Sequence, residues 1–292
     1  MTARRDIRKT VRRILPVLGL FAGLAILLAY PASELLDSYK RAQIAASIDS
    51  EAAAVDTSQK DEILAQAHAY NRHLAGLPTE IAAESIWPYE RQLTPDGHNV
   101  AFGYVVIPKI ALTMPVYHGT SDAVLSAGVG HLDDTSLPVG GSDTHAVLSA
   151  HSGLNGARAF DDIRNLEPGD VFGIKVLGEL YCYRVTDSVV LLPEDIRPDA
   201  VAIHPGEDLC TLITCTPYGV NSHRLLVNGV RCAVPDDFYD QGPSVGDVVT
   251  NRRVLPAVIG LAVAVAVLLL IGVMRRRART KKSRAGDGGP MT

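Results

Sequence analysis

From Val100 onward, the sequence is a series of short β-rich runs separated by turn residues. The runs are AFGYVVI, LTMPVY, HAVLSA, VFGIKVL, YCYRVTDSVVLL, CTLIT and RLLVNGV. Turn formers such as Gly140-Gly141, Pro168-Gly169 and Asn228-Gly229 lie between many of them. Many short strands at this spacing are typical of a closed or nearly closed all-β barrel. The sequence therefore predicts a mainly β fold.

One strand–loop–strand unit of this series carries reactive side chains. In TLITCTPYGVNSHRLLVNG, an apolar strand ends on Cys215, a Pro-Tyr-Gly turn follows, and a second strand opens with Arg224. Such a unit can fold back on itself and place the thiol beside the guanidinium. A nearby cation stabilises a thiolate, the nucleophilic form of cysteine, and can hold a developing oxyanion.

A histidine lies at the end of another apolar strand. The run VLSAHSG ends on His151, just before a glycine-containing loop. Cysteine, histidine and arginine at strand ends are the components of a thiol acyl-transfer site. The sequence contains nine histidines, most of which we expect to be structural. His223 adjoins Arg224, so its side chain points to the opposite face of an extended strand.

Two long uncharged runs flank the rest of the chain. Residues 14–32 form a run of 19 and residues 254–274 a run of 21, each long enough to cross a bilayer as a helix. Clusters of Lys and Arg precede the first run and follow the second, which predicts cytoplasmic termini and an external middle. The alternatives are a cleaved signal peptide for 1–32 and a buried core helix for 254–274.

Charge and cysteine content indicate which partners, disulfides and metal sites to expect. The basic tail after residue 274 orients the membrane segment and is no sign of a nucleic-acid partner, and residues 14–274 contain 15 Lys and Arg against 30 Asp and Glu. An outside location permits disulfides among the four cysteines. With Cys215 kept free, at most one bridge can form among Cys182, Cys210 and Cys232, and the alternative is that all three are small buried hydrophobes. No metal-ligand spacing is present, and we expect no metal and no cofactor.

The segment before the barrel reads as helices followed by turns. Apolar residues recur at three- and four-residue intervals between Ser33 and Ala75, with a first helix capped by Ser33 and a second over Ser58 to Leu74. Pro78, Pro88 and Pro95 favour turns over residues 77–100.

The chain resembles a class C, pilin-polymerising sortase of Gram-positive bacteria. The matching stretches are FGYVVIPKI, MPVYHGTSDAVLSAGVGH, DTSLPVGG, VLSAHSG and TLITCTPYGVNSHRLLV, within about Trp87 to Cys232. The resemblance implies an eight-stranded sortase-type β-barrel and a cysteine transpeptidase that cleaves LPXTG-type sorting signals between Thr and Gly. It also implies that His151 is the acid and base and that Arg224 holds the carbonyl oxygen or substrate backbone.

Class C sortases carry a lid where this chain has Trp87-Pro88-Tyr89. The family's lid places Asp-Pro-aromatic over the cysteine, and here Trp87 replaces the aspartate. We therefore expect an aromatic plug from Tyr89 or Trp87 without an ionic contact. The alternative is that Trp87 packs on the barrel.

The predicted function is a membrane-anchored cysteine transpeptidase that joins pilin subunits by isopeptide bonds through a thioester. Its partners would be LPXTG-bearing pilin or surface proteins, the lysine amine of a second subunit, and the lipid bilayer. The alternatives are a sortase that anchors surface proteins to cell-wall peptidoglycan and a catalytically silent, membrane-tethered assembly module. The predicted divisions are a cytoplasmic basic segment 1–13, a transmembrane signal anchor 14–32, an extracellular helical linker 33–76, a lid region 77–100, a catalytic barrel 101–235, a linker 236–253, a transmembrane helix 254–274 and a cytoplasmic basic tail 275–292.

Overall fold

A computed structural model gives the arrangement of the middle of the chain. It describes residues 43–94, 100–152, 159–196, 198–217 and 219–241, together with residues 19, 23, 40, 259, 260 and 263. The predicted membrane spans 14–32 and 254–274 fall outside the described residues, apart from isolated positions. Among the described residues, no helix combines the length and the apolar character needed to cross a bilayer.

The described barrel is closed and has eight strands, as the resemblance to sortases implies. The strands are β1 (Gly103–Ile107), β2 (Leu112–His118), β3 (Val129–His131), β4 (Thr144–Ser149), β5 (Val171–Val176), β6 (Glu179–Leu191), β7 (Asp208–Thr216) and β8 (His223–Cys232). They close in the order β1-β2-β3-β4-β7-β8-β6-β5. Most neighbours are antiparallel, but β2 pairs with β3 and β4 pairs with β7 in parallel. The short helix α3 (Asp122–Ala127) connects β2 to β3.

Alternation along the strands fills the barrel with apolar side chains. Val105, Ile107, Leu148, Phe172 and Leu212 are fully buried in this interior. Burying each side chain of this size contributes about 1.5–3 kcal/mol, so the interior accounts for much of the fold's stability.

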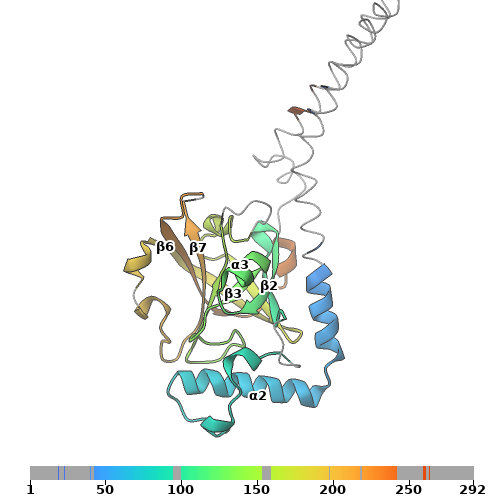
Figure 1. Cartoon of the computed structure of the whole chain (residues 1–292), viewed down its shortest axis with the longest axis vertical. Coiled ribbons are helices and arrows are strands. Elements are labelled where there is room, and N and C mark those ends of the chain that lie inside the picture. The colour runs from blue at the N-terminus through green and yellow to red at the C-terminus, as the bar shows by residue number, and fades with distance from the viewer. Residues whose placement is uncertain are drawn as a thin grey trace, which may run out of the picture. The chain divides into compact units, whose positions relative to one another are not determined.

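Helix α2 (Thr57–Leu74) packs on the barrel. It begins one residue before the predicted helix, because Asp56 caps it by accepting a hydrogen bond from the Gln59 amide at 2.9 Å. Asn71 binds the backbone of Leu137 twice, donating to its carbonyl at 3.0 Å and accepting from its amide at 2.7 Å. These bonds fasten α2 to the barrel, and Figure 1 shows α2 at the end remote from the arrowhead of β7.

A second apolar cluster covers the outer surface of β1, β5 and β6. Ala45 and Ile48 of the helical segment 43–54 pack there with Tyr104, Val171 and Phe238. The Tyr104 hydroxyl donates to Asp49 at 2.8 Å, which joins this helix to the sheet. The segment that precedes the barrel in sequence and the segment that follows it therefore meet on one face of the barrel.

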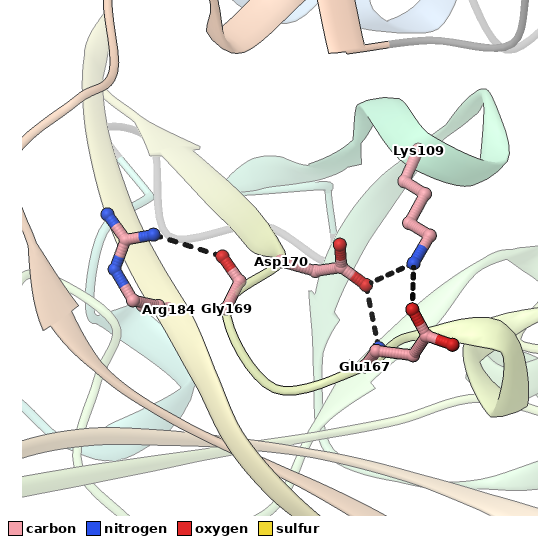
Figure 2. Close-up of polar contacts among 5 residues, drawn as sticks. All are labelled: Lys109, Glu167, Gly169, Asp170 and Arg184. Carbon is pink, nitrogen blue, oxygen red and sulfur yellow. Dashed lines mark hydrogen bonds and ion pairs between the residues drawn. The ribbon is translucent and has the colours of Figure 1, made fainter.

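The turn before β5 is held by charged groups, as Figure 2 shows. Lys109 contacts Asp170 at 2.7 Å and Glu167 at 3.3 Å, and Arg184 of β6 donates to the Gly169 carbonyl at 3.0 Å. Exposed ion pairs of this kind contribute about 0–1 kcal/mol, so their main effect is to hold the turn in place.

Candidate active site

The parallel pairing of β4 with β7 brings His151 to Cys215. Ser149 is the partner of Ile213 in this ladder. The pairing continues past the end of β4, because the Ala150 amide donates to the Ile213 carbonyl at 3.2 Å and the Thr214 hydroxyl donates to the Ala150 carbonyl at 2.8 Å. Continued two residues past Ser149 and Ile213, the same register places His151 level with Cys215.

The antiparallel pairing of β7 with β8 brings Arg224 to the other side of the same cysteine. Cys215 and Arg224 are direct partners in this ladder. Opposite residues have Cβ atoms about 4.5–5.5 Å apart, so the thiol and the base of the arginine side chain are neighbours. Cys215 thus lies on the central strand of three, with His151 on one flank and Arg224 on the other.

A hydrogen-bonded row farther down these strands shows that the three side chains share one face. His145 Nε2 lies 2.8 Å from the Thr211 hydroxyl, which lies 2.9 Å from Asn228 Oδ1. His151, Cys215 and Arg224 stand six, four and four residues from these positions. Even steps along a strand return to the same face.

The three residues are half-buried, and nearby polar groups hold their backbones or side chains. The Ser152 hydroxyl donates to the Cys215 carbonyl, and the Phe160 amide donates to the His151 carbonyl at 3.0 Å. Arg224 Nη1 donates to the carbonyls of Asn221 and His223, each at 3.2 Å. A partly exposed thiol between an imidazole and a guanidinium can carry out nucleophilic acyl transfer.

Ser152 and Thr214, which were not predicted from the sequence, fasten the ends of β4 and β7 to each other. The only available signal was a hydroxyl residue directly beside His151 and Cys215. We assign both a positioning role, because they bind backbone carbonyls next to the reactive side chains.

Three other histidines of the barrel strands make structural contacts. His131 is fully buried, its Nε2 donates to the Ser136 carbonyl at 2.8 Å, and burial lowers its pKa to about 4. His145 Nδ1 donates to the Ala202 carbonyl at 2.7 Å, and burial is the main cause that lowers its pKa. His223 lies beside Ser222, 2.9 Å from its hydroxyl. The described residues contain no group of three or more His, Cys, Asp or Glu that could hold a metal ion.

The predicted lid residues have their contacts on α2, β2 and β3. The Trp87 amide donates to Gln66 Oε1 of α2 at 2.9 Å, and the Arg91 guanidinium lies 4.3 Å from the center of the Trp87 ring. The Tyr89 hydroxyl lies 2.9 Å from both Nδ1 and the carbonyl of His131 and accepts from the Gly119 amide at 3.0 Å. Pro88 precedes the short turn Tyr89–Arg91.

No hydrogen bond, ion pair or ring contact between described residues joins Trp87 or Tyr89 to Cys215, His151 or Arg224. The structure therefore brings the three reactive residues together, and the described polar contacts of Trp87 and Tyr89 are with other residues. A lid role for Trp87-Pro88-Tyr89 stays a prediction.

We expect Tyr89→Phe to lower the free energy of unfolding by about 1–3 kcal/mol, because the Gly119 amide loses its partner in a half-buried site. Urea unfolding measures this, with Tyr239→Phe as control, since Tyr239 is 65% exposed. An unchanged unfolding midpoint would contradict the anchoring role of Tyr89. Faster alkylation of Cys215 in the variant would support the lid, since it would mean that the segment also covers the thiol.

Comparison with known proteins agrees with this geometry. The family model "Sortase domain" matches residues 105–232, which include His151, Cys215 and Arg224. A crystal structure of sortase C1 from Streptococcus agalactiae is 37% identical, covers 65% of this chain and 98% of its own, and superposes with a TM-score of 0.59.

The chain belongs to the sortase family. Sortases are cysteine transpeptidases, so the enzyme class predicted from the sequence is confirmed at the level of the family. A sortase C of Clostridium perfringens, solved with the C-terminal cell wall sorting motif, is 34% identical, covers 66% of this chain and 99% of its own, and has a TM-score of 0.57.

The similarity to curated sortases covers a smaller share of the chain. The sortase A of Streptococcus agalactiae is 27% identical over 124 residues, which are 41% of this chain and 49% of the relative. The chain thus spans about half the length of the curated relatives that it matches.

Proposed function

We propose that this sortase is a class C transpeptidase that cleaves an LPXTG-like sorting signal and joins the acyl fragment to a lysine of a second pilin subunit. The observation that carries the proposal is Cys215 paired directly with Arg224 and flanked by His151. The class rests on solved class C sortases that are 34–37% identical over about two thirds of this chain.

The geometry suits two acyl transfers in sequence. The Cys215 thiolate attacks the threonine carbonyl, and the Arg224 guanidinium stabilises the oxyanion. The His151 imidazolium protonates the departing glycine amine, which leaves a thioester on Cys215. The lysine amine then attacks the thioester and gives its proton to neutral His151. An isopeptide bond forms and Cys215 leaves as the thiolate.

Two further candidates compete with this function. Anchoring of surface proteins to peptidoglycan is favoured by the curated matches, which are sortase A proteins. A catalytically silent assembly module has less support, since Cys215, His151 and Arg224 are all present on one face of the sheet.

A peptide assay tests the proposed reaction. The full chain is incubated with an LPXTG-bearing peptide and a lysine-containing acceptor peptide, and the products are identified by mass spectrometry. We expect an amide between the threonine carbonyl and the lysine Nε, and none with an acceptor in which arginine replaces that lysine. Exclusive use of a peptidoglycan-derived amine would instead favour wall anchoring, and no cleavage with any acceptor would favour the silent module.

We also propose that the chain crosses the membrane twice, through residues 14–32 and 254–274, with the barrel on the extracellular face. The support is the two uncharged runs and their basic outer flanks. In intact protoplasts treated with protease, we expect terminal epitope tags to survive while the segment 33–250 is digested. Loss of the C-terminal tag from outside would refute this topology.

A further inference from the structure

Two of the four cysteines face each other across neighbouring strands. All four are free thiols in this structure, and Cys182 of β6 is the direct partner of Cys232 of β8 in an antiparallel ladder. Residues opposite each other in such a ladder have Cα atoms about 4.5–5.5 Å apart, within the range of about 4.4–6.8 Å that a disulfide spans. We propose that Cys182 and Cys232 are a site of disulfide formation.

The other disulfide pairings are excluded by the face of the sheet on which each cysteine lies. Cys182 and Cys232 both pack in the cluster on the outer surface of the barrel, with Phe238 and Leu180. Cys210 belongs to the interior cluster, on the opposite side of the sheet. Of the three cysteines outside the active site, only Cys182 and Cys232 can therefore meet.

Distance protects the nucleophile from this pair. Cys215 is opposite Arg224, and Cys232 lies eight residues farther along β8. Eight residues of a strand span roughly 26 Å, so neither cysteine of the pair can reach Cys215 while the barrel is folded. Oxidation at the pair leaves the reactive thiol available.

The exposure of the two thiols sets the order of the reaction. Cys232 is partly exposed, whereas Cys182 is 0% exposed. The Cys232 thiolate attacks a low-molecular-weight disulfide such as oxidised glutathione, forms a mixed disulfide and releases one thiol. The Cys182 thiolate then attacks the Cys232 sulfur and releases the second thiol. The protein loses two electrons and two protons, and the oxidant becomes two thiols.

The surroundings of Cys182 make the second step, the attack of its thiolate on the Cys232 sulfur, slow and dependent on pH. Burial is the main cause that raises the pKa of Cys182 to about 11, and the neighbouring Cys232 adds to it. Because the attacking species is the thiolate, ring closure speeds up as the pH rises toward that value.

The bond would hold the last residue of β8 against β6. Beyond Cys232 the chain continues to Phe238, which packs in the same cluster with the helical segment 43–54. The disulfide would therefore reinforce the barrel where its C-terminal segment departs, and it would close a loop of about 50 residues, which disfavours the unfolded chain.

The test uses the full chain with Cys215→Ala, which leaves Cys182, Cys210 and Cys232 as its thiols. The protein is incubated with oxidised glutathione at alkaline pH, denatured, alkylated and weighed. We expect one alkylated thiol per molecule and a tryptic peptide that joins Cys182 to Cys232. Before alkylation, the mass of the oxidised protein should be lower than that of the reduced protein by about 2 Da, for the two hydrogens lost. The melting temperature should exceed that of the reduced protein by roughly 5–15 °C.

Two variants keep the test decisive. Cys232→Ser should remove the linked peptide and the effect of reductant on melting, and its partly exposed position makes it the safer of the two substitutions for folding. Cys210→Ala should leave the linked peptide and the effect of reductant on melting unchanged. Three alkylated thiols after oxidation of the folded protein, or a linked peptide that contains Cys210, would overturn the proposal.

Discussion

Cys215→Ala is expected to abolish both cleavage of the sorting signal and formation of the lysine amide. The substitution removes the atom that forms the thioester, and neither His151 nor Arg224 can replace it as nucleophile. Cys215 is only half-buried at the end of β7, so the loss of one sulfur atom removes little packing. The peptide assay measures the activity, and thermal unfolding checks that the variant keeps its fold.

Cys210→Ala is the matched control, since it makes the same change on the same strand. Cys210 faces the interior and is 0% exposed, so we expect a lower melting temperature and retained activity. Undiminished amide formation by the Cys215→Ala protein would refute the assignment of the nucleophile.

His151→Ala is expected to lower the turnover number by about 10²- to 10⁴-fold, the range that general acid–base catalysis commonly contributes. The imidazole must protonate one amine and deprotonate another, and the register places it level with the thiol. Imidazole added to the solution should restore part of the activity, which loss of a merely structural histidine would not allow. Steady-state rates with and without imidazole provide the measurement.

His223→Ala is the control for this variant, because His223 adjoins Arg224 but alternates to the other face of β8. We expect its turnover number to stay within about threefold of the wild-type value, since surface substitutions usually have small effects. Equal losses in both variants would mean that His151 acts through the fold rather than through the reaction.

The reactive residues could be found from the sequence because each one stands at the end of a recognisable strand. The strand that ends on Cys215 and the strand that opens with Arg224 are separated by one short turn, so their pairing is a local event. The resemblance to sortases singled out the same two residues and His151. Helix α2 was likewise predictable from its apolar spacing and from Gly76 just beyond its end.

Contacts between distant segments could not be read in the same way. The parallel pairing of β4 with β7 joins residues that are 64 positions apart, and no local pattern specifies it. The same holds for the Tyr89 hydroxyl on His131, 42 positions away, and for Asn71 on Leu137, 66 positions away. The facing cysteines illustrate the point, because the choice among three pairings depended on which face of the sheet each occupies.

The closure of the barrel limits how a peptide can be captured. Every strand of the described barrel already has a neighbour on each side. A short stretch of edge nevertheless stays open, because β6 continues to Leu191 whereas its pairing with β5 ends at Arg184. Main-chain pairing with an extended peptide, the mode by which many domains hold peptides without regard to their side chains, is therefore confined to such short stretches. We expect the rest of a sorting signal to be recognised by side chains and loops around Cys215. Closing the sheet thus favours sequence selectivity, since it leaves the sequence-blind mode of binding little edge to use.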